Sequence, residues 1–520
     1  MWTTTGSSQS FYLVWRNVYI KRCIVIHILR DQRIDVSLDQ LDDECFRYLS
    51  SISLNEKLEN NISVNLDIKS SEQFVQYYNH PHRDLINSLC VYSGAEITLP
   101  PVTNIDKFNL LIRSIQQEGE RIRSFYCSLI PNTVQSLSIT DYNGWYYQGD
   151  VKLPDSITEL ILDSPTDSGN KRAPLLRDIL SNLPCKLREL VLPHLNLGSI
   201  CRLPDTLVDL NYIGDYERLA KFIVPPNKTY MNCSLILDGS FEALEWLKSN
   251  KWVTMTSISD TRLDEIPSHV QRIYAGDVVI EPDTISSEVS LVSTMGASIA
   301  PGPLPSNLTT LLIYYYDGLL RELVSSRLQE LELNIYNQQL EPGLFPSSLT
   351  SLSLGSYNSP IKSNVFPNQL KVLKLNEFNG VLEIASLPSS LTRLDLSSFT
   401  GSFDSVGPLD SLRDLSIDTM NPSISTLLLN VANVKITLKQ ITQDTSLSNI
   451  PIQKLLLFFR GQDTRRFVLQ PQFLPHSIKY LYLKNIDIES NNIVPNTCKY
   501  LSTDQLELNK DLLPISVKLK

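Results

Sequence analysis

The chain has 520 residues, and 42% of them are hydrophobic, which is enough for several globular domains or for one long array. Its formal net charge of −10 disfavours nucleic acid or an anionic membrane surface as the main partner. The eight cysteines stand singly, without C-x-x-C pairs or Cys/His metal spacing, so we expect buried, reduced thiols and a cytoplasmic location. No apolar run approaches the roughly 18 residues that a membrane span requires.

The first hundred residues differ in pattern from the rest of the chain. Residues 11–30 are largely apolar without Gly or Pro, which predicts a mostly buried helix, and residues 38–49 carry apolar side chains at helical spacing. Residues 62–68 predict a strand and residues 72–78 a helix. We interpret the start of the chain as an N-terminal α-helical cap, because a solenoid needs one to cover its first apolar coil.

From residue 126 onward, one short pattern recurs, P-x-x-[LIV]-x-x-[LI]. Its best copies, at Pro346, Pro367 and Pro388, are spaced by 21 residues, and a period of ~20–29 residues carrying L-x-x-L-x-L belongs to leucine-rich solenoids. Such units stack because none can bury its apolar face alone. The other copies begin at Pro131, Pro154, Pro184, Pro204, Pro267, Pro305, Pro475 and Pro495, and a proline-free copy begins at Ser325. Weaker copies begin at Gly407 and at Ile450.

The end of each unit predicts a short strand. Leucines alternate there with polar residues, as at Leu352 and Leu354, and alternation of period two marks a strand with one buried face. The proline precedes the strand, where its missing N–H breaks no ladder bond and its fixed φ sets a turn. We therefore expect a β-rich, leucine-rich-repeat-like solenoid with a parallel sheet on its concave face.

Three central units carry an aromatic residue followed by asparagine, at Asn337, Asn358 and Asn379. An asparagine at the same bend of each coil can bond backbone groups that would otherwise stay unpaired, and the ring beside it would fill the core. The combination Phe/Tyr-Asn-x-x-Ile/Leu, then apolar-Pro-x-x-Leu-x-x-Leu, resembles the FNIP repeat, a leucine-rich-like unit known mainly from social amoebae. The resemblance is best over residues 325–400 and looser over 126–325 and 470–520.

The resemblance also bears on the N-terminus. FNIP-repeat proteins often begin with a segment similar to Val14-Trp-Arg-Asn17 and Tyr19-Ile20, described as F-box-like, and an F-box is a helical module that docks onto a ubiquitin-ligase scaffold. The chain lacks the Leu-Pro start usual in an F-box. We assign an N-terminal helical, F-box-like segment to residues 1–60, transition or capping coils to 61–125, and the repeat solenoid to 126–520.

Two gaps, near residues 226–266 and 418–450, interrupt the solenoid, and we interpret both as degenerate units. In the first gap, the spacing of Phe241, Leu244 and Leu247 predicts a short helix with these three side chains on one face. The elements expected in the gaps are this helix over 240–249 and strands over 233–237, 252–258, 427–429 and 434–438.

Strand residues that point away from the leucines are the candidates for partner binding. Early units place Glu159, Glu189 and Asp209 in adjacent rungs, where like charges repel unless a cation or a basic partner relieves them. The last units offer tyrosines and a lysine, Lys484, which are residue types with interface character. The candidate partner-binding residues are Glu159, Asp163, Glu189, Asp209, Tyr274, Tyr480, Tyr482 and Tyr500.

No motif for catalysis, cofactor binding or metal binding is present. The sequence has no G-x-S-x-G, Walker loop or G-x-G-x-x-G, and His80-Pro-His82, the only close histidine pair, lacks further ligands at suggestive spacing. We expect no catalytic residue, no cofactor and no metal. Three functions are weighed. The first is a non-enzymatic protein-interaction scaffold whose acidic rungs hold a basic segment, and the second is a ubiquitin-ligase substrate adaptor that docks its scaffold through residues 11–50. The third, an enzyme, has no motif in its favour.

Overall fold

The computed structural model divides the chain into two compact units. The first unit comprises Met1–Ile236 and Trp246–Met255, and the second comprises Leu237–Glu245 and Thr256–Lys520. The structure describes residues 18–42, 49–93, 105, 107–112, 130–141, 151–164, 174–193, 197–259, 266–276, 279–281, 284–294, 299–300, 304–316, 318, 320–323, 325–461, 466–505 and 508–519.

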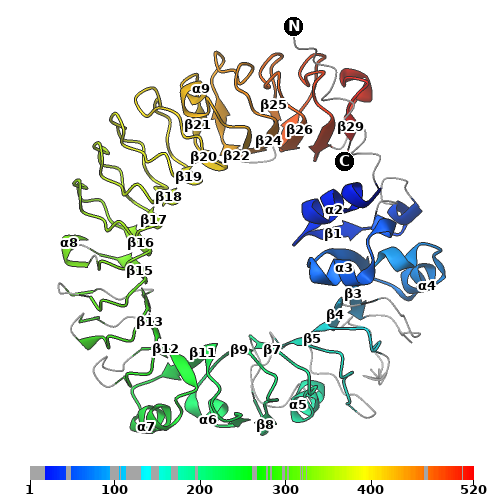
Figure 1. The fold of residues 1–520 in the computed structure, drawn as a ribbon, viewed down its shortest axis with the longest axis vertical. Helices are drawn as coiled ribbons and strands as arrows, with labels where there is room; N and C mark the ends of the chain where they lie inside the picture. Colours follow the sequence, from blue (N-terminus) through cyan, green and yellow to red (C-terminus); the bar gives the residue numbers. More distant parts are fainter. Residues whose placement is uncertain are drawn as a thin grey trace, which may run out of the picture. The chain divides into compact units, whose positions relative to one another are not determined.

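Parallel strands, one from each coil, build the first unit (Figure 1). Each strand pairs with the strand of the next coil, and the ladder begins at Arg33, further toward the N-terminus than the proline pattern reaches. The strands are β1 (Arg33–Val36), β2 (Ser63–Ile68), β3 (Ser88–Ser93), β4 (Lys107–Ile112), β5 (Ser136–Asp141), β6 (Glu159–Asp163), β7 (Glu189–Leu192), β9 (Asp209–Gly214) and β11 (Tyr230–Leu237).

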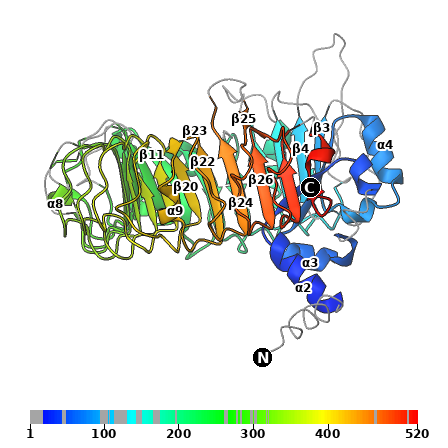
Figure 2. The same cartoon turned by 90° about the horizontal axis from the view of Figure 1, so that it is seen from above.

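The second unit repeats the same arrangement over more coils, with its strands side by side (Figures 1 and 2). Leucine lies opposite leucine along the ladder, as Leu331 lies opposite Leu352 and Leu352 opposite Leu373. The expected parallel solenoid is therefore confirmed. The strands are β13 (Arg272–Ala275), β14 (Leu291–Thr294), β15 (Thr310–Tyr315), β16 (Glu330–Ile335), β17 (Ser351–Leu354), β18 (Val372–Lys374), β19 (Arg393–Leu396), β20 (Asp414–Ile417), β22 (Asn433–Leu438), β24 (Lys454–Phe459), β26 (Tyr480–Lys484), β28 (Tyr500–Thr503) and β29 (Lys518–Leu519).

Each proline of the repeat pattern forms the turn that leads into a strand. The carbonyl oxygen of Pro346 accepts a hydrogen bond from the N–H of Leu349 at 3.1 Å, and Pro367 and Pro388 make the same bond to the third residue after them. All eleven prolines named above form this bond, at 2.9–3.2 Å. The turn delivers the next leucines to the core, where Leu352 and Leu354 are fully buried.

The asparagines of the central units link one coil to the next. The side-chain oxygen of Asn337 accepts a hydrogen bond from the backbone N–H of Asn358 at 2.8 Å, and that of Asn358 accepts one from Asn379 at 2.7 Å. Asn379 continues the series to Thr400 at 2.9 Å. The expected bonding to backbone is confirmed, and its target is the following coil.

The aromatic rings beside these asparagines form a second ladder inside the core. Tyr357, Phe378 and Phe399 are all almost completely buried. Neighbouring ring centroids are 6.3 and 5.8 Å apart, and the ring planes lie within 10° and 17° of parallel. Because the period repeats the same residue type at the same place, successive coils add one ring each to a continuous column.

A hydroxyl two residues after the proline is a structural feature that the sequence patterns above leave out. The Ser348 hydroxyl donates a 2.7 Å hydrogen bond to the carbonyl of Leu328 in the preceding coil, and Ser390 donates one to Leu370 at 2.6 Å. Such bonds satisfy carbonyls at the turns. The same position is filled at Thr133, Ser156, Thr206, Ser477, Thr497 and Ser516, which bond carbonyls of the preceding coil.

The N-terminal elements agree with only part of the expectation. The strand and helix over residues 62–78 are confirmed by β2 and by α4 (Ser71–Asn79). The helix α2 (Val18–Leu29) forms within residues 11–30, but its described side chains are half-buried or exposed instead of mostly buried. In residues 38–49 the described part forms 3-10 turns such as η1 (Asp39–Asp42), and residues 43–48, including Cys45, lie outside the described residues.

The two degenerate regions contain most of the expected elements. The helix α7 (Phe241–Ser249) follows β11 and precedes β12 (Val253–Ile258), as predicted. Leu244 and Leu247 are buried, but Phe241 is 71% exposed, because it is the first residue of the helix and Ala243 takes the buried position. In the second region, the strand at 434–438 is confirmed by β22, whereas residues 427–429 end a short helix, α9 (Ile424–Leu427), and are not a strand.

The remaining elements are short. In the described part of the chain, three two-stranded pairs lie outside the main ladders: β8 (Cys201–Arg202) with β10 (Phe222–Ile223), β21 (Thr419–Met420) with β23 (Gln440–Ile441), and β25 (Phe467–Val468) with β27 (Ile486–Asp487). The other described helices are α3 (Leu54–Glu59), η3 (Arg83–Leu85), α5 (Pro174–Ser181), α6 (Tyr216–Leu219), α8 (Leu320–Leu323) and η7 (Lys510–Leu512).

Candidate functional site

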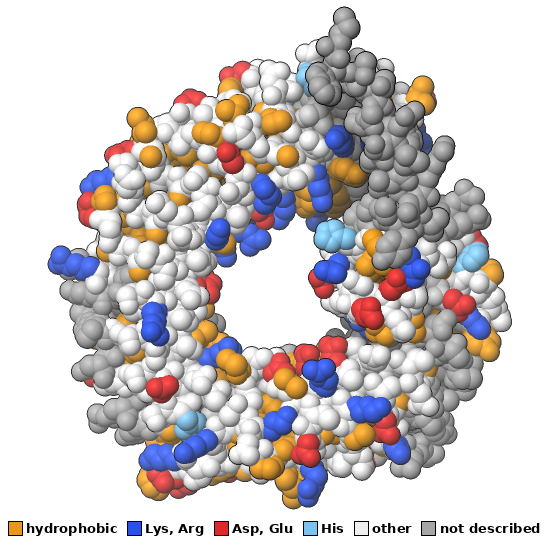
Figure 3. Space-filling view, in the orientation of Figure 1, with side chains coloured by type: hydrophobic (Ala, Val, Ile, Leu, Met, Phe, Trp, Pro, Cys, Tyr) orange, Lys and Arg blue, Asp and Glu red, His pale blue; other side chains and the backbone are white. Residues whose placement is uncertain are grey.

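Three carboxylates of the first unit lie in one row across neighbouring strands. The ladder register places Glu159 of β6 opposite Glu189 of β7, and Glu189 opposite Asp209 of β9. All three side chains are half-buried. We call Glu159, Glu189 and Asp209 the acidic row; Figure 3 shows acidic side chains gathered over this part of the fold.

Glu189, the middle residue of the acidic row, is the carboxylate whose charge this arrangement disfavours most. Burial raises the pKa of the Glu189 carboxyl, and the charges of Glu159 and Asp209 raise it further. At the end of the row, the Asn232 amide donates hydrogen bonds of 3.0 and 2.9 Å to the two oxygens of Asp209. The row therefore holds negative charge that a cation would stabilise.

The tyrosines of the last coils lie close together in the second unit. Tyr480 of β26 lies opposite Tyr500 of β28, and the two rings stack with centroids 5.2 Å apart and planes within 7°. The Tyr482 ring lies 5.3 Å from the Phe458 ring of β24. The structure thus brings together three of the predicted site residues as one aromatic cluster.

Two predicted site residues lie apart from these groups. Asp163 is at the other end of β6 from Glu159, where the register places Thr140 opposite it. Tyr274, 38% exposed, belongs to β13, at the start of the ladder that has the tyrosine cluster near its end. Neither residue extends the acidic row or the tyrosine cluster.

Lysines surround the tyrosine cluster, and of these sequence reasoning found Lys484 but missed Lys454 and Lys518. Lys454 of β24 lies opposite Tyr480, Lys484 of β26 opposite Phe458, and Lys518 of β29 opposite Tyr500. The ammonium of Lys435 lies 5.4 Å from the centroid of the Phe458 ring. The signal was present in the sequence as outward strand positions, but Lys454 belongs to a weak repeat copy and Lys518 to a strand beyond the last recognised proline.

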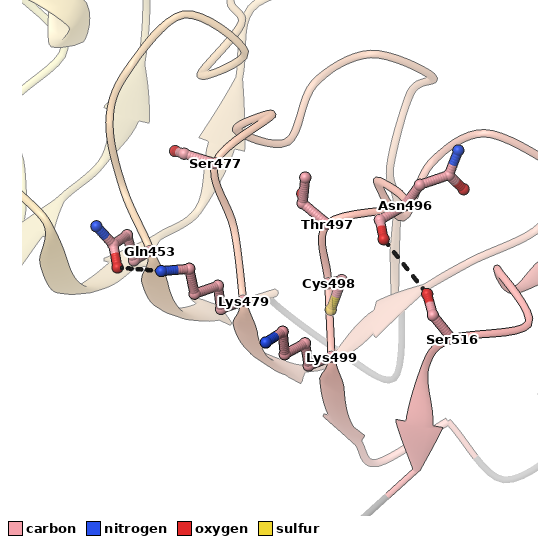
Figure 4. Close-up of a pocket in the computed structure, with 8 residues that line it drawn as sticks. All are labelled: Gln453, Ser477, Lys479, Asn496, Thr497, Cys498, Lys499 and Ser516. Carbon is pink, nitrogen blue, oxygen red and sulfur yellow. Dashed lines mark hydrogen bonds between the residues drawn. The ribbon is translucent and has the colours of Figure 1, made fainter. Parts of the chain in front are cut away.

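A hollow of about 480 Å³ lies beside these strands, at the turns that precede β24, β26 and β28 (Figure 4). The Lys479 ammonium donates a 2.9 Å hydrogen bond to Gln453, and the Ser516 hydroxyl donates one of 3.3 Å to the carbonyl of Asn496. Lys479 and Lys499 extend in the same direction from adjacent coils. The lining is completed by Ser477, Thr497 and the buried Cys498.

The described cysteines are free thiols with two kinds of environment. Cys90, Cys201, Cys233 and Cys498 are buried, as expected, whereas Cys23 and Cys185 are exposed. The expectation of uniform burial is therefore wrong for these two; Cys185 lies in a turn that follows its proline. Cys45 and Cys127 lie outside the described residues.

Within the described residues, no three His, Cys, Asp or Glu side chains gather as a metal ion would need. His80 instead ends α4 and lies 3.6 Å from Asp42. Among the helices of the described part, none has the length and apolarity to cross a membrane.

Comparisons with known proteins find one family match and several similar structures. Residues 325–357 and 357–399 match the family model described as FNIP Repeat. Among solved structures, the chain is similar to the circular leucine-rich-repeat protein CroV588 (17% identity over 88% of this chain and 74% of that chain, TM-score 0.38), the mouse RP105/MD-1 complex (14%, 84% and 88%, 0.46) and YopM from Yersinia enterocolitica (16%, 80% and 87%, 0.33). The comparison with curated proteins finds no match. Residues 325–399 therefore carry FNIP repeats, within a leucine-rich-like solenoid whose strands stack leucine on leucine.

Proposed function

We propose that the chain is a non-enzymatic protein-binding scaffold whose acidic row holds a basic segment of a protein partner. The observation that carries the proposal is the register of β6, β7 and β9, which aligns Glu159, Glu189 and Asp209 across adjacent coils. Single, unpaired thiols favour a cytoplasmic setting for this scaffold.

The physical reason is that, in the absence of a partner, the alignment of the three carboxylates costs electrostatic free energy. Glu189 has a raised pKa because burial and its two acidic neighbours disfavour its charge. Lysines or arginines of a bound segment would relieve this repulsion and leave the strand ladder unchanged. A preformed ladder also lowers the ordering cost of binding, since the partner alone must adopt its bound conformation.

Charge reversal of the row tests the proposal. Glu159→Lys, Glu189→Lys and Asp209→Lys in one full-length variant should abolish recovery of the natural partner by affinity purification. The matched control reverses three exposed carboxylates of the same unit, Asp155, Asp178 and Asp205, and should retain the partner. Unchanged binding of the row variant at low salt would contradict the proposal, because electrostatic contacts are strongest there.

The ubiquitin-ligase adaptor is the second candidate, and the helix α2 is the observation that favours it. The F-box-like segment was assigned to residues 1–60 and its docking surface to residues 11–50; residues 1–17 and 43–48 of it lie outside the described residues. Affinity purification of the intact chain should recover a ligase scaffold if the adaptor function holds. Recovery of other partners without any ligase scaffold would leave the interaction scaffold as the function.

A further inference from the structure

We propose that the strand face of β22, β24, β26, β28 and β29 is a second binding surface, and that it holds an acidic segment of a protein partner. We call this surface the basic face. The proposal rests on the scaffold function above and names a partner of opposite charge to the one at the acidic row.

The charge of the basic face is of one sign. The five strands together contain no Asp or Glu, although the chain as a whole carries a net charge of −10. Lys454, Lys484 and Lys518 are exposed. Among the described residues, no carboxylate lies within 4.0 Å of these three ammonium groups, which is the reach of an ion pair. The basic face therefore presents three lysines that no carboxylate of the described residues neutralises; Figure 3 shows basic side chains over this part of the fold.

At the border of the basic face, the same sheet contains two cations that a carboxylate neutralises. In β20, Asp414 lies 3.4 Å from the Arg393 guanidinium and 3.5 Å from the Lys435 ammonium. One carboxylate thus forms ion pairs with two cations, and the second cation, Lys435, lies on β22. Beyond β22, no described carboxylate lies within 4.0 Å of Lys454, Lys484 or Lys518, so the unmatched charge begins after β22.

The aromatic rings favour a peptide as the occupant. Tyr480 and Tyr500 stack on each other, and the strand positions of Lys454 and Lys518 flank the pair on its two outer sides. Lys435 lies over Phe458, and the Tyr482 ring packs against the same side chain. Rings engaged in this way offer edges and hydroxyls, which suit carboxylates and apolar side chains. A nucleobase would need a free ring face for stacking.

The hollow of Figure 4 extends the basic face at one edge. Lys479 and Lys499 line it and immediately precede Tyr480 and Tyr500 in the chain. Its volume of about 480 Å³ is large enough for an acidic side chain together with water. An acidic segment that crosses the coils can therefore contact lysines on the strands and at their turns.

Binding of a designed peptide to the full-length chain tests the proposal. The probe is a fluorescently labelled peptide of alternating glutamate and leucine, and binding is followed by anisotropy at low and high salt. We expect Lys454→Glu, Lys484→Glu and Lys518→Glu in one variant to weaken binding by about tenfold or more. The matched control, Lys152→Glu, Lys186→Glu and Lys251→Glu, makes the same change in net charge at exposed sites of the first unit and should bind like the wild type.

Two further measurements make the result decisive. The triple variant Lys454→Gln, Lys484→Gln and Lys518→Gln introduces no negative charge and should also weaken binding, which guards against misfolding of the reversal variant. A labelled single-stranded oligothymidylate should bind more weakly than the peptide; tighter binding would overturn the choice of partner. Equal peptide affinity for the face variant and its control would overturn the surface itself.

The test of the basic face and the test of the acidic row can fail independently of each other. Charge reversal of the acidic row should leave the glutamate peptide bound, because the row lies on β6, β7 and β9 and not on the basic face. Loss of the natural partner in the row variant, together with absent peptide binding by the wild type, would refute the basic face alone.

Discussion

Substitution of Glu189 by glutamine should stabilise the first unit. Glu189 lies between Glu159 and Asp209 in the ladder, and adjacent strands are ~4.8 Å apart. Two charges about 5 Å apart in water repel by about 0.8 kcal/mol, so two neighbours amount to ~1.6 kcal/mol before screening. Salt and the half-exposed position of the side chain reduce this value, and we expect a gain of about 0.5–1 kcal/mol.

Urea denaturation at neutral pH measures the effect. Glu189→Gln should raise the unfolding midpoint, and the gain should shrink as salt is added. Asp155→Asn is the control, because it also removes one carboxylate from the first unit, at an exposed turn position away from the row. An equal gain in the control, or no gain in Glu189→Gln, would refute the idea that repulsion within the row costs stability.

The pH dependence gives a second check on the same reasoning. Glu189 has a higher pKa in the folded chain than its ordinary value, so the folded state binds this proton more tightly than the unfolded state does. The cost of its charge is therefore full above the folded pKa and disappears below the unfolded pKa of about 4.3. The advantage of Glu189→Gln should fall away as the pH is lowered through that range.

Three other substitutions or probes test the coil architecture. Asn358→Ala removes the acceptor of the Asn379 N–H, so hydrogen exchange at Asn379 should quicken and stability should fall by about 1 kcal/mol, whereas Ser359→Ala in the same bend should leave that amide protected. Phe378→Ala removes a buried ring between Tyr357 and Phe399 and should cost about 3–5 kcal/mol in thermal or urea unfolding; a loss below 1 kcal/mol would contradict the ring column. Thiol labelling followed by peptide mapping should modify Cys185 quickly and Cys201 slowly, because Cys185 is exposed and burial raises the pKa of Cys201 to about 12; equal rates would contradict the described burial.

The candidate site shows where sequence reasoning succeeded and where it stopped. Counting positions after each proline placed Glu159, Glu189 and Asp209 in neighbouring rungs, and the ladder register agrees. The same counting failed at Lys518, because no recognised repeat precedes β29. It also misjudged Phe241, whose helical spacing is correct but whose side chain stands at the exposed start of α7.

The sequence by itself determined the repeated part of this protein. A proline turn, a short alternating strand and an aromatic-asparagine step are local patterns, and a fixed period forces each of them to meet its own copy in the next coil. Contacts between like positions, such as Leu352 with Leu373 or Asn358 with Asn379, therefore follow from the period alone.

Only the tertiary structure decided the contacts between residues that do not occupy equivalent positions of the repeat. The ladder extends to β1 through coils without the proline pattern, and the lysines of weak repeats join the tyrosines of strong ones on a single face. Such contacts depend on the lengths of irregular connections, which set the register between strands but leave no periodic trace in the sequence. For this reason the coils could be predicted from their repetition, whereas the basic face became visible only once the strands were aligned.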